Sequence, residues 1–270
     1  MRLNAFSYMG GKSYLASWII KHMSWHNIYV EVFGGGANVL LQKPRSKIEV
    51  LNDYDEDIFN FYKIMLEEGD KFWEKINYLP YSRKLYYEYL KEWENGNKGR
   101  NNLERAVRWY YLQSLGFSGM IGNTFRIGIK KNVSASFFQK TQKFPFIIRR
   151  LQGTIIENLD FEECIKKYDS TKTLFYCDPP YWFDKNYYKI NFKEEDHIRL
   201  SNILNKIKGN AIVSYYYNKK LKKYYSDWFF DEKVITKFSY YNKNGNKNMG
   251  KELLLTNYKI KGLKQLKNYV

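Results

Sequence analysis

Short runs rich in β-branched and aromatic residues alternate with helical patterns along most of this chain. The expected strands are residues 28–33, 48–52, 153–157, 173–177, 211–216, 233–240 and 252–257, and the expected helices are 12–23, 56–67 and 196–208. Strands that alternate with helices favour a parallel sheet, because parallel strands need a crossover connection. A loop at 242–250, rich in Asn, Lys and Gly, predicts that the last two strands form an antiparallel hairpin. We therefore expect an α/β fold with a doubly wound, mostly parallel, seven-stranded sheet.

Residues 66–145 differ from the rest of the chain. They read as helices with dense aromatic residues, interrupted by a polar linker at 95–102. A chain of 270 residues suits one large domain or one domain with an insertion. We therefore predict that residues 1–65 and 146–270 form one domain, and that 66–145 is a helical subdomain inserted into it.

The net charge of the chain indicates which kind of partner it binds. Lys and Arg number 45 against 28 Asp and Glu, a formal net charge of +17. Such an excess favours a polyanionic partner, most simply nucleic acid, although an AT-rich genome would also enrich Lys. Cys164 and Cys177 are too few for a disulfide framework or a four-cysteine zinc site, and the three histidines lack a ligand spacing, so no metal is expected. Without a signal-peptide core or an apolar run of membrane length, we expect a cytoplasmic protein with no membrane partner.

The hexapeptide at residues 176–181, Tyr-Cys-Asp-Pro-Pro-Tyr, ends an expected strand. Pro179 and Pro180 fix φ and cannot donate to a strand ladder, so the strand stops at Asp178. The resulting elbow carries a carboxylate, backbone carbonyls and the ring of Tyr181. These groups suit a planar ring with an exocyclic amino group, because two acceptors can hold its N–H bonds while the aromatic ring stacks. The alternative is an Asp-Pro turn with a core tyrosine.

A second motif is the run of Gly34, Gly35 and Gly36 after the first expected strand. Glycines let the chain turn tightly and let a ligand approach the backbone. Asp53 ends the next strand, where a carboxylate can accept both hydroxyls of a ribose. The dinucleotide spacing G-x-G-x-x-G is absent, which favours a nucleoside without phosphates, such as S-adenosylmethionine. An ordinary strand–turn–helix connection is the alternative.

Gly10, Gly11, Lys12 and Ser13 resemble part of a Walker A motif, but the upstream glycine that this motif requires would fall at Phe6. The lysine could instead anchor a carboxylate, such as that of a methionine group, at a helix N-terminus.

Together these motifs resemble the Dam-type (D12 class, alpha group) DNA adenine N6-methyltransferases, over nearly the whole chain. The matching segments are 8–12, 31–36 with Val32 in place of a proline, 52–53, 160–161, 178–181 and 251–258. The resemblance implies a Rossmann-like S-adenosylmethionine-dependent methyltransferase fold and a site-specific adenine methyltransferase of bacterial or phage origin. It implies a cofactor site at Tyr8, Gly10, Gly11, Lys12, Glu31, Phe33, Gly34, Gly36, Asp53, Asp160, Phe161 and Asp178. It also implies that Asp178, Pro179, Pro180 and Tyr181 hold the target adenine.

The resemblance further places residues 118–131 in a DNA-reading hairpin, with Ser118, Asn123, Arg126, Lys130 and Lys131 as contacts. Residues 116–120 depart from the members that read GATC, so the recognition sequence stays open. For Lys130 and Lys131 taken alone, a solvated charge pair is the stronger interpretation.

The expected reaction is direct methylation of an adenine flipped out of double-stranded DNA, without a metal or a covalent enzyme intermediate. Methylation of cytosine N4 or of RNA adenine is one alternative, and a non-catalytic DNA-binding protein on a decayed methylase fold is another. We expect a monomer, with a dimer left open. Pairing with a restriction nuclease is also left open.

Overall fold

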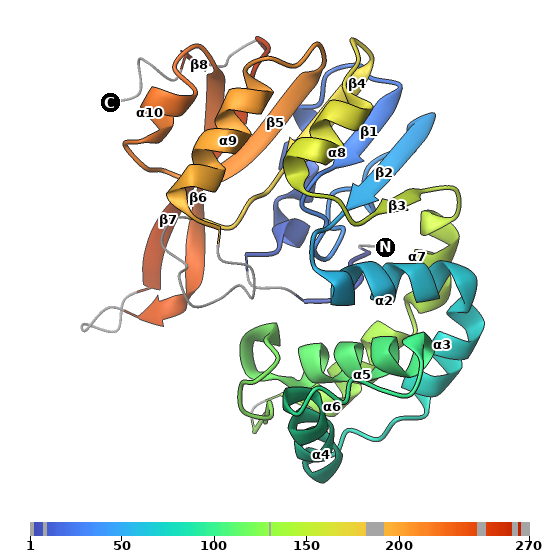
Figure 1. Ribbon diagram of the computed structural model, residues 1–270. Helices are drawn as coiled ribbons and strands as arrows, with labels where there is room; N and C mark the ends of the chain where they lie inside the picture. Colours follow the sequence, from blue (N-terminus) through green and yellow to red (C-terminus); the bar gives the residue numbers. More distant parts are fainter. Residues whose placement is uncertain are drawn as a thin grey trace. The chain divides into compact units, whose positions relative to one another are not determined.

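The computed structural model describes residues 3–7, 10–129, 131–181, 192–241, 247–260 and 264–265. The chain divides into two compact units (Figure 1). Unit 1 comprises Met1–Ile20, Gly34–Arg45 and Glu49–Leu159, and unit 2 comprises Lys21–Phe33, Ser46–Ile48 and Asp160–Val270. The predicted insertion, residues 66–145, falls within unit 1.

Unit 2 is built on strands β1 (Ile28–Glu31), β4 (Thr173–Cys177), β5 (Asn210–Tyr216), β7 (Lys247–Thr256), β6 (Phe229–Tyr241) and β8 (Lys264–Gln265), adjacent in this order. β1, β4 and β5 are parallel, whereas β5–β7, β7–β6 and β6–β8 are antiparallel. All five residues of β4 are buried, which explains its nearly continuous apolar sequence, since parallel strands are covered on both faces.

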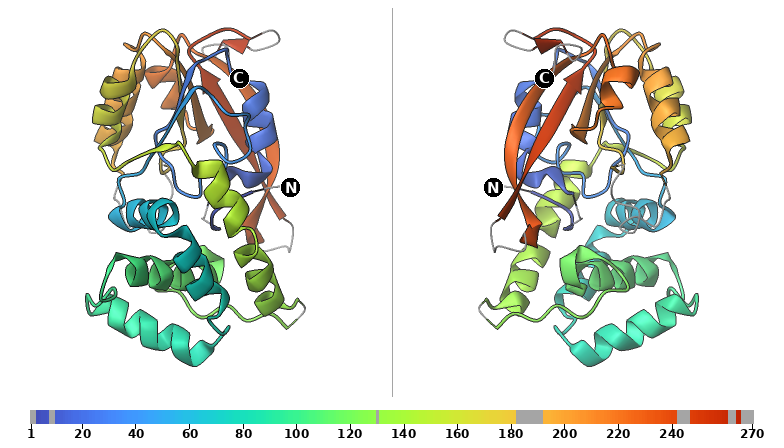
Figure 2. Two further views of the ribbon diagram at one scale, coloured as in Figure 1. Left: turned by 90° about the vertical axis from the view of Figure 1, so that its right-hand side faces the viewer. Right: turned by 90° about the vertical axis from the view of Figure 1, so that its left-hand side faces the viewer.

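Three helices of unit 2, α8 (Phe161–Tyr168), α9 (Glu194–Leu204) and α10 (Leu221–Tyr224), lie on the same face of these strands (Figures 1 and 2). Asp160 caps α8 by accepting a hydrogen bond from the Glu162 amide. Asp196 is the third residue of α9, and its side chain accepts a hydrogen bond from the backbone N–H of Lys193 at 2.9 Å at the start of the helix.

Unit 1 contains the parallel pair β2 (Ile48–Asn52, with Ile48 in unit 2) and β3 (Ile155–Glu157), paired from Val50↔Ile155 to Asn52↔Glu157. Its helical part consists of α2 (Glu56–Glu67), α3 (Gly69–Asn77), α4 (Arg83–Glu94), α5 (Asn102–Leu115), η2 (Phe117–Gly119), α6 (Val133–Thr141) and α7 (Phe144–Leu151). Helix α5 packs between α2 and α4 (Figure 1). Asp55, Ser82, Asn101 and Asn132 cap α2, α4, α5 and α6, as their side-chain oxygens satisfy amides of the first turn.

The aromatic residues of unit 1 form much of its core. Phe61, Phe72, Tyr110 and Phe144 are fully buried. The Phe144 ring lies 5.2 Å from Phe72 and 4.9 Å from Tyr110, edge to face in both pairs. Aromatic pairs in this geometry add to the stabilisation gained by burial of the rings. Their density in the sequence therefore reflects packing in this unit.

The predicted α/β fold, with parallel strands and a C-terminal antiparallel pair, is confirmed. The described residues form eight strands, because the two-residue β8 adds to the seven expected. The predicted helix at 12–23 is divided into η1 (Lys12–Tyr14) and α1 (Ala16–Lys21). It stops before His22, whose carbonyl accepts a hydrogen bond from the Tyr258 hydroxyl at 2.7 Å.

Candidate active site and DNA-contact loop

Asp53 and the glycine turn are joined by hydrogen bonds within unit 1. The Asp53 carboxylate accepts from the Gly35 amide at 2.7 Å and from the Asp55 amide at 2.9 Å. Gly35 has a φ of +44°, a conformation that favours glycine. Burial raises the pKa of Asp53 to about 6, although both hydrogen bonds act in the opposite direction. The two segments that the sequence assigned to one cofactor site therefore lie in contact with each other.

Gly34 and Gly36 are explained by close packing of the chain. A Cβ on Gly34 would lie 2.8 Å from the Leu51 side chain and 2.9 Å from the Asn52 carbonyl. A Cβ on Gly36 would lie 3.0 Å from the carbonyl of Phe6. These contacts require small residues at both positions, independently of any ligand.

The lysine of the N-terminal motif is largely buried. Lys12 is 4% exposed, and its ammonium donates to the Gly10 carbonyl at 2.8 Å. Gly11 is the residue before η1. Tyr8, the aromatic residue expected to join this group, lies outside the described residues.

Three aromatic rings cluster in unit 2 after the end of β1. The Phe33 and Phe161 rings stack at a centroid distance of 5.8 Å, and Phe192 lies 5.7 Å from Phe33 and 5.6 Å from Phe161. Asp160 caps α8 and pairs with Arg199 at 2.9 Å. The structure thus brings Phe33 and Phe161 together in one aromatic cluster, in which Phe161 is 6% exposed and the Arg199 guanidinium lies 4.7 Å from its ring centroid. Phe192 joins them, and sequence reasoning missed it because it stands outside every recognised motif.

Glu31 lies at the end of β1 in unit 2. It is 2% exposed and accepts a hydrogen bond from the Tyr29 hydroxyl at 2.9 Å. Backbone pairing continues past the end of the strand, since the Val32 amide donates to the Tyr176 carbonyl at 3.0 Å. The end of β1 is therefore tied to the strand that carries Asp178.

The elbow after β4 is held from two neighbouring strands of unit 2. The Ser214 hydroxyl on β5 donates to Asp178 Oδ1 at 2.8 Å. The Tyr181 hydroxyl lies 2.5 Å from Glu252 Oε1 on β7 and 3.2 Å from Asp178 Oδ1. The Tyr181 ring is 7% exposed and packs edge to face on Tyr216 at 4.7 Å. Tyr181 is therefore a fixed part of the elbow.

Sequence reasoning missed Ser214 and Glu252. Both are fully or almost fully buried, at 0% and 1% exposure. Ser214 is polar in a run of buried β5 residues, and Glu252 precedes three buried leucines on β7. A polar residue in an otherwise apolar strand is the signal that could have found them, because buried polar groups need partners.

The predicted DNA-reading hairpin differs from a regular two-stranded ladder. Residues Gly116 and Phe125 form an isolated antiparallel bridge, flanked by a hydrogen bond from the Phe117 amide to the Thr124 carbonyl at 2.8 Å. Ser118 has a φ of +60° within η2, which interrupts strand geometry. The Asn123 side chain donates to the Phe117 carbonyl at 3.0 Å and so closes the loop. Lys130 lies outside the described residues.

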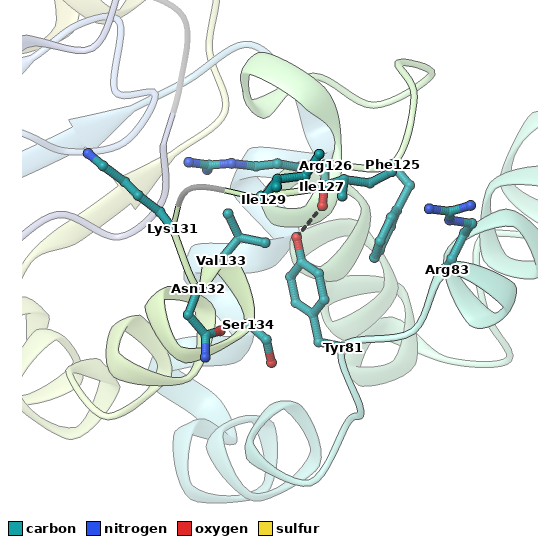
Figure 3. A pocket seen from close by; sticks show the side chains of 11 residues that line it. Tyr81, Arg83, Phe125, Arg126, Ile127, Ile129, Lys131, Asn132, Val133 and Ser134 are labelled. Atoms are coloured by element: carbon teal, nitrogen blue, oxygen red, sulfur yellow. Dashed lines mark hydrogen bonds between the residues drawn. The ribbon is translucent and has the colours of Figure 1, made fainter.

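A pocket of about 450 Å³ opens beside this loop in unit 1 (Figure 3). Tyr81 forms part of its wall, with its hydroxyl 2.6 Å from the Arg126 carbonyl and its ring 5.0 Å from Phe125. Arg83 lies beside the Phe125 ring, whereas Arg126 and Lys131 extend towards the opposite side (Figure 3). The exposed side chains that line this pocket include the basic Arg126 and Lys131, the polar Asn132 and Ser134, and Ile127 and Ile129, which are 61% and 99% exposed.

No group of three or more His, Cys, Asp or Glu side chains is arranged to hold a metal ion within the part of the chain that the structure describes. In that same part, no helix is both long and apolar enough to span a membrane.

Comparisons with known proteins agree with these motifs. Type II methyltransferase M.MjaIII of Methanocaldococcus jannaschii is 26% identical over 281 residues, which cover 92% of this chain and 96% of that protein. Type II methyltransferase M.CviBI of Paramecium bursaria Chlorella virus NC1A is 26% identical over 195 residues, covering 68% and 71%. DNA adenine methylase of Escherichia coli K12 is 24% identical over 180 residues, covering 64% and 62%. The family model described as D12 class N6 adenine-specific DNA methyltransferase matches residues 8–268, and the chain belongs to this family.

Proposed function

We propose that this adenine-specific DNA methyltransferase takes its methyl group from S-adenosylmethionine and acts on an adenine flipped out of duplex DNA. The observation that carries the proposal is the elbow at Asp178, where a carboxylate at the end of a parallel strand is fixed by a buried hydroxyl at 2.8 Å. A base inside a duplex cannot reach such a group, so the target must leave the stack. The proposed place of action is the cytoplasm of a bacterial or phage-infected cell, where DNA is accessible.

In this proposal, Asp53 binds the ribose hydroxyls of the cofactor. Two backbone amides hold its carboxylate in one orientation, and an ionised carboxylate can accept from two vicinal hydroxyls. Phe33, which is partly exposed beside the buried Phe161, offers an aromatic ring of the kind that an adenine contacts. Lys12 is assigned to the methionine carboxylate on the family resemblance.

Asp178 and a carbonyl of Pro179 or Pro180 would accept the two hydrogens of the target amino group. The adenine N6 lone pair is delocalised into the ring, and these acceptors favour a tetrahedral nitrogen whose lone pair can attack. When bound, S-adenosylmethionine supplies an electrophilic methyl group on its sulfonium. The enzyme's contribution is positioning in a desolvated pocket, which can account for much of the acceleration.

The distribution of charge supports a DNA surface on the helical part of unit 1. The 52 residues from Arg105 to Ile156 contain no Asp or Glu, but nine Lys and Arg. Arg105, Arg108 and Arg150 pair with carboxylates from outside this stretch. Within the described residues no carboxylate pairs with Arg126, Lys131 or Lys140. Uncompensated cations of this kind suit phosphate groups.

Lys140 is the most confined of the three cations. Its ammonium donates to the Ser7 hydroxyl at 2.8 Å. Burial, together with the positive charges of Arg126 and Lys143, lowers the pKa of Lys140. A phosphate oxygen would relieve this repulsion, so we assign residues 66–145 to DNA recognition.

The test is methyl transfer by the purified chain from radiolabelled S-adenosylmethionine. Matched substrates are duplex DNA, each of its single strands, and an RNA of the same sequence. We expect label in the duplex at the highest kcat/KM, and none in any substrate with Asp178→Ala. Label confined to RNA, or equal transfer by Asp178→Ala, would contradict the proposal.

A further inference from the structure

A chain of three hydroxyl and carboxyl groups ends at the catalytic elbow of unit 2. Ser214 Oγ lies 2.8 Å from Asp178 Oδ1 and 3.1 Å from the Tyr176 hydroxyl. Ser214 has a single hydroxyl proton, and the ionised carboxylate is the stronger and nearer acceptor. The hydroxyl of Tyr176 therefore donates to Ser214, and Ser214 donates to Asp178. In this series of hydrogen bonds, the acceptor of each of the two hydroxyl protons is therefore assigned.

Burial between two adjacent strands makes this series of hydrogen bonds rigid. Ser214 is 0% exposed and Tyr176 is 1% exposed, on the adjacent parallel strands β5 and β4. Tyr176 pairs in register with Ile212, two residues before Ser214. Buried hydrogen bonds between strands of one sheet move little, since neighbouring side chains fill the surrounding space. Asp178, just past the end of β4, is thus tied to a fixed point on β5.

A second contact fixes the other end of the elbow. Tyr181 has one hydroxyl proton, with Glu252 Oε1 at 2.5 Å and Asp178 Oδ1 at 3.2 Å. The shorter contact assigns this proton to Glu252. Ser214 therefore donates to the Asp178 carboxylate from a fixed position on β5.

We propose that Ser214 is a positioning residue for the methyl transfer. It does not touch the substrate. Its hydrogen bond directs Oδ1 of Asp178 towards β5 and so sets the plane in which the carboxylate meets the adenine amino group. This inference rests on the proposed role of Asp178. A displaced carboxylate would leave substrate binding almost intact but slow the chemical step, because a misplacement of about 1 Å can cost roughly 10²-fold.

The experiment measures single-turnover methylation at saturating S-adenosylmethionine and saturating duplex DNA. Ser214→Ala removes the donor, and Tyr176→Phe removes the group one step further away. Thr256→Val is the matched control, since Thr256 is also fully buried in the same sheet but donates to the Tyr258 carbonyl at 2.8 Å. Melting temperatures and cofactor affinity are measured for each variant.

We expect Ser214→Ala to lower the single-turnover rate by about 10- to 100-fold, with cofactor affinity changed less than about threefold. Tyr176→Phe should lower the rate by a smaller factor, and Thr256→Val should leave it unchanged. A rate for Ser214→Ala within about twofold of the parent, or an equal loss in Thr256→Val, overturns the inference.

Asp178→Ala distinguishes a failure of the positioning role of Ser214 from a failure of the proposed function. If Asp178→Ala is inactive while Ser214→Ala is fully active, only the positioning role is wrong. If Asp178→Ala is itself active, the proposed function of the elbow is wrong and the role of Ser214 falls with it.

Discussion

Asp53 is under two opposing influences. Burial disfavours its ionised form, whereas the amides of Gly35 and Asp55 favour it. Burial is the larger effect, and the pKa rises from the ordinary 3.8 to about 6. The side chain is therefore ionised at neutral pH but close to its titration range.

This pKa predicts how cofactor binding depends on pH. In the proposed cofactor site, an ionised Asp53 would accept hydrogen bonds from the ribose hydroxyls, and protonation below about pH 6 would remove part of that capacity. Affinity for S-adenosylmethionine should be constant above about pH 7 and should fall by up to tenfold per pH unit below about pH 6. Isothermal calorimetry across this range measures the effect.

The matched variant is Asp53→Asn, which keeps the shape of the side chain but cannot titrate. It should bind S-adenosylmethionine more weakly by about 1.5–3 kcal/mol at neutral pH. Its affinity should then show no dependence on pH near 6. An unchanged affinity at neutral pH would remove Asp53 from the cofactor site.

A second residue-scale prediction concerns Asp178. Asp178→Ala removes the carboxylate that Ser214 holds at 2.8 Å. Loss of a hydrogen bond that strengthens in the transition state commonly costs about 10²–10³ in rate, and the hydrogen bond proposed for Asp178 would also orient the base. We expect activity to fall at least that far while the melting temperature changes by only a few degrees. Near-full turnover with an unchanged melting curve would refute the assignment.

At the scale of elements, the loop from Gly116 to Asn132 is the segment proposed to contact DNA. The bridge Gly116↔Phe125 and the hydrogen bond from Asn123 to the Phe117 carbonyl close it, and its exposed cations are Arg126 and Lys131. Lys131→Ala and Lys140→Ala should each flatten the dependence of log K on log salt by about 0.9 if each contacts one phosphate. Filter binding to a duplex over a range of salt concentrations gives these slopes.

Arg126→Ala should behave differently from the lysine variants. A bidentate contact with a base edge discriminates by about 1–3 kcal/mol, so loss of Arg126 should reduce the preference for the cognate duplex over a scrambled one. Lys166→Ala is the control, because Lys166 is paired with Glu162 at 2.7 Å on α8. Slopes and preferences that match those of the control in all three variants would mean that DNA is held elsewhere.

The sequence predicted some elements to the residue and missed others. The bounds of α2, β2 and β4 agree with the prediction, because each combines a clear apolar period with a sharp end: a capping Asp55 for α2, and Asp178 before Pro179 for β4. Helices α8 and α10 were not anticipated. Helix α10 has four residues, too few to show a period. Strand β6 begins at Phe229, four residues earlier than expected, since its pairing with β7 is a non-local contact.

At the scale of the whole molecule, local motifs were easier to predict than the partners that hold them. Asp53 and the glycine turn were assigned to one site because each follows a strand, and a hydrogen bond joins them. Ser214 and Glu252 stand out as polar residues in apolar strands, but their hydrogen-bond partners depend on which strands lie next to one another in the sheet. Phe192 was missed because it lies outside every recognised motif. The net charge of +17 predicted a polyanionic partner. The ion pairs of the structure are needed to tell arginines that pair with carboxylates, such as Arg105 and Arg150, from cations without such a partner among the described residues.

The central claim is that this chain forms N6-methyladenine in duplex DNA. The most direct measurement is mass spectrometry of nucleosides from duplex DNA incubated with the purified protein and S-adenosylmethionine, with Asp178→Ala in parallel. We predict N6-methyladenine as the product of the parent protein, absent from the variant. Methyl groups found only on cytosine, or equal N6-methyladenine with both proteins, would contradict the account.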